Sequence, residues 1–165
     1  MKTLLFFLLA TLPCYAGLGE TEAQCITRYD APVATLDDCG RAKTETFIKK
    51  GFYIMITFLD GTAVSVTYRH PWDITDVHTF SSLTQEEIND LLAANSDGKT
   101  WAEQPPSIPP VFPEIKTVWK RDGDGWANLW QDSHGSQLAC SYNKLNREAI
   151  AIIAAAKAKK TTDGL

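Results

Sequence analysis

The stretch FYIMITFLDGTAVSVTY, residues 52–68, decides the fold class of this chain. Two runs rich in β-forming residues flank Asp60-Gly61, a dipeptide that supplies the two positive φ angles of a type I′ hairpin turn. In the second run Val64 and Val66 alternate with smaller or more polar residues, which is typical of a strand with one buried face. The first run is apolar at almost every position, which predicts a central strand that a helix covers on one side.

A helix is predicted ahead of this hairpin, where Thr21 and Gln24 have the spacing of a capping box. It ends before Pro32, because a proline disfavours helical geometry at the preceding residue. The apolar stripe expected along this helix consists of Ala23, Ile26 and Tyr29. Residues 33–46 are predicted to form a loop with an edge strand.

A second helix and further strands are predicted after the hairpin. Thr84 and Glu87 form another capping box, and the helix ends at residues 95–98. Residues 102–114 hold five of the eight prolines, so we expect an extended strap there. Strands are expected at 115–121, 125–131 and 137–143, followed by an Ala-rich helix over 146–160.

This order of elements predicts an α+β fold made of two successive units, each a helix followed by an antiparallel sheet. The first unit spans residues 17–80, and the second spans 81–145 with the Pro-rich strap at 102–114. Residues 146–165 form a C-terminal helix and tail. Weak similarity between the blocks around Gly51 and Gly123 raises a tandem repeat as a hypothesis.

Residues 1–16 have the layout of a signal peptide. Lys2 precedes an apolar run at 4–12, and Cys14 to Ala16 has the small-x-small pattern of a signal-peptidase cleavage site. We therefore predict cleavage after Ala16 and export to the periplasm or the extracellular space. The mature chain would then have 149 residues (165 − 16). The run is too short to span a bilayer. Pro13 fits a lipid-attachment signal poorly, so no lipid anchor is expected.

Three cysteines remain after this cleavage: Cys25, Cys39 and Cys140. An oxidising compartment favours a disulfide, and a Cys25–Cys39 bond would close a loop of about 15 residues, worth roughly 3 kcal/mol. Three reduced, buried thiols are the equal alternative. No Cys-x-x-Cys pair occurs and the three histidines are scattered, so no metal site is expected.

Composition excludes some classes of function. The 165 residues are 44% hydrophobic with a net charge of −4, and no basic cluster precedes the C-terminus, which argues against nucleic acid as a partner. The sequence has no Gly-x-Ser-x-Gly nucleophile motif and no phosphate-binding glycine loop. We therefore expect neither catalysis nor a cofactor.

Aromatic residues are the one surplus, and all five tryptophans follow residue 71. Trp126, Asn128 and Trp130 share a face of the expected strand because side chains alternate with a period of two. If a helix covers that face, these residues belong to the core. If the face is open, it is suited to binding a protein or a glycan. The candidate interaction surface comprises Trp126, Asn128, Trp130, Tyr142 and Trp119.

Residues 19–32, GETEAQCITRYDAP, resemble the opening of the SmpA/OmlA family of small outer-membrane assembly lipoproteins, whose wider fold includes the β-lactamase inhibitor proteins. The positions in register are Gly19, Thr21, Gln24, Tyr29 and Pro32. The resemblance implies helices on an antiparallel sheet, and the inhibitor proteins are tandem repeats of such a unit. Asp30 stands in place of a helix-ending glycine of the family, and the lipid-attachment signal is lacking.

The resulting hypothesis is an exported, non-enzymatic protein of a bacterial envelope. It would act as a protein-interaction module through a sheet face or the Pro-rich strap, with another protein as its partner. The alternatives are a secreted inhibitor of a hydrolase and a small glycan-binding domain.

Overall fold

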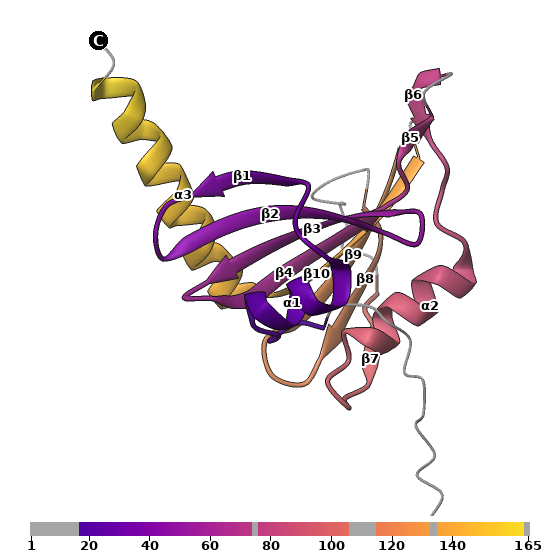
Figure 1. The fold of residues 1–165 in the computed structure, drawn as a ribbon. Helices are drawn as coiled ribbons and strands as arrows, with labels where there is room; N and C mark the ends of the chain where they lie inside the picture. Colours follow the sequence, from indigo (N-terminus) through magenta and orange to yellow (C-terminus); the bar gives the residue numbers. More distant parts are fainter. Residues whose placement is uncertain (1–16, 74–75, 106–114, 133–134, 164–165) are drawn as a thin grey trace, which may run out of the picture.

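An eight-stranded antiparallel sheet organises the chain, in the order β1-β2-β3-β4-β10-β9-β8-β7 (Figure 1). The computed structural model describes residues 17–73, 76–105, 115–132 and 135–163, so the expected signal peptide lies outside the described residues, as does most of the Pro-rich strap. The sheet consists of β1 (Ala34–Asp38), β2 (Ala42–Lys49), β3 (Phe52–Leu59), β4 (Thr62–Arg69), β7 (Trp101–Glu103), β8 (Ile115–Arg121), β9 (Gly125–Asp132) and β10 (Gly135–Tyr142). A second, two-stranded sheet pairs β5 (Trp72–Asp73) with β6 (Asp76–Phe80).

The α+β class is confirmed, but the two expected units are not separate helix-and-sheet bodies. Strand β4 pairs with β10 from Ser65↔Ser141 to Arg69↔Gln137, which joins all the long strands into one sheet. The physical reason is that a sheet edge leaves a row of unpaired backbone groups, and pairing the two edges satisfies both. Figure 1 shows the result as one twisted sheet with the helices arranged around it.

The predicted hairpin is confirmed as β3 and β4. Asp60 and Gly61 adopt φ angles of 49° and 76°, as a type I′ turn requires. Residues 33–46 were predicted as a loop with an edge strand, but they hold β1 and most of β2, which form a full hairpin. The alternation of buried and exposed side chains in β2 was not recognised in the sequence because charged residues interrupt the apolar pattern. In the structure Phe47 is fully buried, while its neighbour Ile48 is 43% exposed.

Helices α1 (Glu22–Tyr29) and α2 (Gln85–Ala94) pack on one face of the sheet, and both predicted capping boxes are present. The predicted stripe of α1 is wrong in part, because Ala23 and Ile26 are exposed. Tyr29 is buried as predicted, and Cys25, one turn before it, faces the sheet as well; the Tyr29 ring lies 5.6 Å from that of Phe47.

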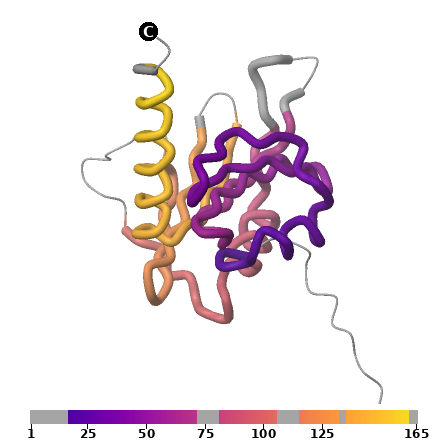
Figure 2. The backbone as a smooth tube through the Cα atoms, turned by 60° about the vertical axis from the view of Figure 1, so that its left-hand side comes forward, coloured from indigo at the N-terminus to yellow at the C-terminus, as the bar shows by residue number. Residues whose placement is uncertain are grey.

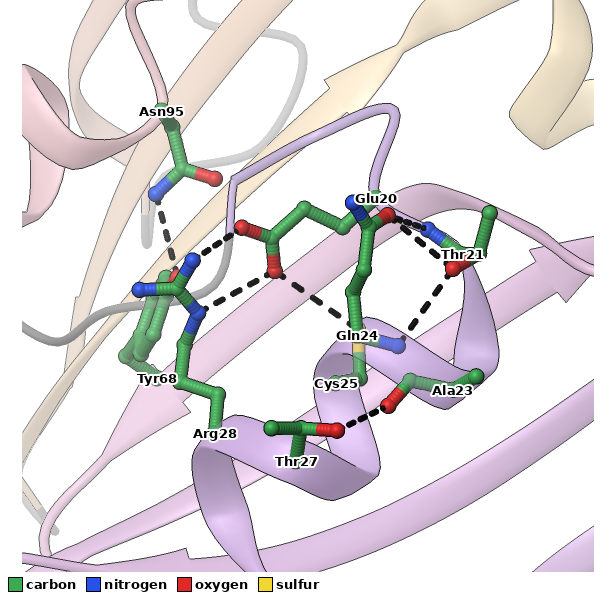
Figure 3. A network of polar contacts seen from close by, with 9 residues as sticks. All are labelled: Glu20, Thr21, Ala23, Gln24, Cys25, Thr27, Arg28, Tyr68 and Asn95. Atoms are coloured by element: carbon green, nitrogen blue, oxygen red, sulfur yellow. Dashed lines mark hydrogen bonds and ion pairs between the residues drawn. The ribbon is translucent and has the colours of Figure 1, made fainter.

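A polar cluster fixes α1 to the preceding segment (Figure 3). The Glu20 carboxylate accepts hydrogen bonds from Nη2 and Nε of Arg28 at 2.5 and 3.2 Å, and the Cys25 thiol lies 3.9 Å from it. Burial, with Glu20 adding to it, raises the pKa of the Cys25 thiol to about 12. The protonated thiol is therefore the favoured form at neutral pH.

The cysteines of the described part are not bonded to one another, so the Cys25–Cys39 disulfide is not formed. The alternative of three reduced, buried thiols describes Cys25 and Cys140, whereas Cys39 is reduced but only half-buried. Cys25 points into the core from α1, whereas Cys39 lies in the turn between β1 and β2, where its N–H donates to Ala42. Cys140 is fully buried on β10, and burial raises its pKa to about 12.

A buried arginine joins α2 to the other end of the sheet. Nη1 of Arg121 donates to the Asn95 carbonyl oxygen, at the end of α2, over 2.6 Å. Its guanidinium lies between the rings of Trp101 and Tyr142, 5.3 and 5.1 Å from their centroids. The Asn95 amide in turn donates to the Tyr68 hydroxyl at 3.1 Å, inside the core (Figure 3).

Helix α3 (Asn143–Asp163) packs on the opposite face of the sheet. Ala149, with half-buried Ile152 and Ile153, contacts Ala42, Leu59 and Val64. The helix begins three residues earlier than predicted, because the backbone and carboxylate oxygens of Asp124 accept the N–H groups of residues 143 and 144. Figure 2 shows α3 along one side of the sheet, away from α1 and α2. Within the described ranges, no helix has the length and apolar character of a membrane span.

Candidate interaction surface

The face of the sheet that carries α3, called the α3 face here, is covered over only part of its width. Strand register places its side chains in rows that cross the strands. The row of Thr44, Thr57, Ser65, Ser141 and Trp126 lies next to the residues that contact α3. The following two rows are Thr46, Met55, Thr67, Ala139 and Asn128, and then Ile48, Tyr53, Arg69, Gln137 and Trp130.

A groove of about 520 Å³ lies over these two outer rows and reaches β1 at the edge of the sheet. Its lining is mostly apolar, and it contains four of the large hydrophobic side chains that are exposed in the described structure. These are Val33 (57% exposed), Leu36 (56%), Ile48 (43%) and Met55 (39%). Single exposed hydrophobic residues are ordinary, but a contiguous group marks a binding surface.

Most polar side chains of the groove lie at one end of it, and Thr46 on β2 is the exception. Thr67, Arg69 and Gln137 come from β4 and β10. The guanidinium carbon of Arg69 is 5.7 Å from the centroid of the Tyr53 ring, so the arginine is held against the floor by a cation–π contact. The groove thus combines an apolar end at β1 and β2 with a hydrogen-bonding end at β4 and β10.

The five residues expected to form one interaction surface are divided between the two faces. Trp126, Asn128 and Trp130 lie on the α3 face, as their spacing predicted, and are half-buried. The ammonium of Lys120 lies 5.5 Å from the Trp126 ring. Trp119 and Tyr142 lie on the opposite face and pack against the core under α1 and α2.

The apolar side chains of the groove were missed at the level of the sequence. The sequence does hold a signal for them. Every second side chain of a strand lies on the same face, and Ile48 and Met55 occupy positions on one face of their strands. The sequence does not reveal where α3 crosses the sheet, however, and the position of α3 decides which part of the face stays open.

Histidines and carboxylates build no catalytic or metal centre in the described part of the chain. His70 stacks on Phe52 at 4.9 Å, and its ring nitrogens lie 3.3 Å from the Gly51 carbonyl and 3.2 Å from the Glu87 carboxylate. It therefore ties the end of β4 to the first turn of α2. No three His, Cys, Asp or Glu side chains gather as metal ligands among the residues that the structure describes. His134 and the side chain of His78 lie outside the described residues.

Comparison with known proteins adds little to this description. No protein-family model matches the chain, and no curated protein sequence matches it. Among solved structures, a cysteine-rich secretory protein of Staphylococcus aureus is similar with 12% sequence identity and a TM-score of 0.46, over 78% of this chain and 46% of that one. The chain thus spans less than half of that protein. A likeness of this degree assigns neither a family nor a function.

Proposed function

We propose that this chain is an exported, non-enzymatic protein of a bacterial envelope that binds another protein through the groove of the α3 face. The observation that carries the proposal is the group Val33, Leu36, Ile48 and Met55, exposed together beside a face that α3 covers in part. Hydrophobic side chains held in a groove with a few polar groups at one end are what protein interfaces use at their centres. The layout of residues 1–16 supports export.

A capture experiment with a matched pair of variants tests the proposal. Met55 lies in the groove and is 39% exposed, and Ile26 lies on the outer side of α1 and is 38% exposed. The variants Met55→Asp and Ile26→Asp therefore change side chains of nearly equal exposure at two different places on the surface. The tagged full chain and both variants are expressed in the source organism and recovered with their bound proteins. We expect a partner that the wild type and Ile26→Asp retain and Met55→Asp loses. Equal recovery with all three, or no partner with any, would contradict the proposal.

A hydrolase as the partner is a second candidate. The observation that favours it is the strand order, which is symmetrical about the β4–β10 pair, with one helix and four strands contributing to each half. We infer from this symmetry a tandem repeat, the arrangement that resemblance to the β-lactamase inhibitor proteins implies. Assays of β-lactamases and cell-wall hydrolases with the wild type and Met55→Asp test it; unchanged enzyme activity with both would remove this candidate and leave other partners open.

A further inference from the structure

The groove and α3 cross the same five strands, side by side. Helix α3 begins directly after β10, packs over β4, β3 and β2, and reaches β1 through an ion pair of 2.8 Å between Lys157 and Asp37. The residues that line the groove come from β10, β4, β3, β2 and β1. Neighbouring strands lie about 4.8 Å apart, so both cross roughly 19 Å of sheet. The groove therefore runs across the strands, as α3 does.

These dimensions suit an α-helix. A helix rises 1.5 Å per residue, so a groove of roughly 19 Å accommodates about 13 residues, between three and four turns. The same face already binds a helix, since the aliphatic side chains of α3 lie on Ala42, Leu59 and Val64, one row away from the groove. The two outer rows lie about 13 and 20 Å along the strands from the Ala42 row, so a helix over them would lie on the open part of the face, with the Thr44 row between it and α3.

Other occupants explain the groove less well. An extended strand added to the edge of β1 would run parallel to the strands, so it would contact Val33 and Leu36 and leave Ile48 and Met55 uncovered. A second copy of the chain could not lay its sheet flat on the groove, because α3 stands on the same face beside it.

We propose that the groove binds an amphipathic α-helix of the partner protein, laid across β1, β2, β3, β4 and β10 on the same face as α3. The inference rests on the proposed function, since it specifies the partner of the same surface. The helix presents an apolar stripe at positions i, i+3, i+4 and i+7 to Ile48, Met55 and Leu36. Gln137 and Thr67 meet the polar margin of that stripe at the far end of the groove.

Site-specific photocrosslinking tests the geometry. Benzoylphenylalanine replaces Leu36, Ile48 or Met55, one at a time, in the full chain expressed in the source organism, with Ile26 as the control position. Mass spectrometry then locates the partner residue attached to each site. We expect crosslinks from the three groove positions to one segment of one partner, at separations of three, four or seven residues, and none of them from Ile26.

The outcomes separate the two proposals. Separations of two residues would indicate an added strand, and attachment to the chain itself would indicate a second copy; either overturns the helix and leaves binding through the groove intact. Absence of protein crosslinks, or recovery of a glycan alone, would overturn both.

A synthetic peptide of the crosslinked segment provides a second measurement. We expect it to gain helical circular dichroism on binding the wild-type chain. A buried charge opposes an apolar contact, so Met55→Asp should weaken peptide binding about tenfold or more while Ile26→Asp leaves it unchanged. A peptide that binds without becoming helical would refute the inference.

Discussion

Replacing Gly125 by alanine probes the packing that holds α2 to the sheet. Gly125 on β9 faces Arg121 on β8 in the register of the sheet. A Cβ atom at Gly125 would lie 2.4 Å from both Cγ and Nε of Arg121 and 2.8 Å from its Cδ. The backbone at Gly125 is outside the left-handed region, so the substitution introduces a steric conflict without backbone strain.

Arg121 has little room to yield. Its side chain is 2% exposed, lies between the rings of Trp101 and Tyr142, and donates to the Asn95 carbonyl. Overpacking of a filled core costs about 1–3 kcal/mol. If the arginine moves instead, a charge-assisted hydrogen bond of about 1.5–3 kcal/mol and a cation–π contact of about 0.5–2 kcal/mol are weakened. We therefore expect Gly125→Ala to lower the free energy of unfolding by about 3 kcal/mol.

Urea unfolding, followed by tryptophan fluorescence, measures this loss. The double variant Gly125→Ala/Arg121→Ala gives the decisive comparison, because alanine has none of the three side-chain atoms that the new methyl group would meet. We expect Gly125→Ala to cost less than about 0.5 kcal/mol in that background, so the two substitutions should be strongly non-additive. Additive effects, or a single variant as stable as the wild type, would refute the packing argument.

Three further predictions concern the helix ends and the thiols. Thr84→Ala removes the N-cap oxygen of α2 and should destabilise the chain by about 1 kcal/mol in the same urea assay; an unchanged midpoint would contradict the capping role. Burial and raised pKa values should protect Cys25 and Cys140 from iodoacetamide at pH 8 in the native chain, while half-buried Cys39 is alkylated; equal labelling, read by mass spectrometry, would show that the core is open. Partial burial opposes ionisation of Glu87, but hydrogen bonds from Thr84 and the nearby His70 prevail and lower its pKa. The ionised form is thus favoured in the folded state, so its contribution is complete above the ordinary glutamate range and is lost as the pH falls through the lowered pKa. Glu87→Gln should flatten the acid side of the stability–pH curve, and an unaltered curve would exclude this linkage.

Local features of the fold were predictable because neighbouring residues determine them. The Asp60-Gly61 turn needs only two positive φ angles, and the capping boxes at Thr21 and Thr84 each close within four residues. The joining of β4 to β10 was not predictable in this way, because it brings together residues about 70 positions apart, such as Thr67 and Ala139. Such pairing depends on which sheet edges remain open once each hairpin has formed.

In the candidate site, too, features determined by neighbouring residues were predictable and features that depend on distant parts of the chain were not. The common face of Trp126, Asn128 and Trp130 comes from strand periodicity alone and was correctly predicted. The separation of Trp119 and Tyr142 from them depends on which side of the sheet α1 and α2 cover. The groove depends, in addition, on where α3 crosses, which follows from the anchoring of its first turn to Asp124 and from its packing on Ala42, Leu59 and Val64.

The position of α3 on its face is the strongest physical reason to regard the groove as functional. Next to the residues that contact α3, the sheet presents a row of small side chains, Thr44, Thr57, Ser65 and Ser141. The larger Ile48 and Met55 lie in the uncovered rows. Full burial of each such side chain would contribute about 1.5–3 kcal/mol to stability, a gain that α3 takes from Leu59 and Val64 but not from Ile48 and Met55. The chain instead holds α3 over Ala42, Leu59 and Val64, beyond the row of small residues, and leaves Ile48 and Met55 in contact with solvent. That arrangement forgoes stability in the isolated chain, and it is the arrangement expected if the missing contacts are made by a partner.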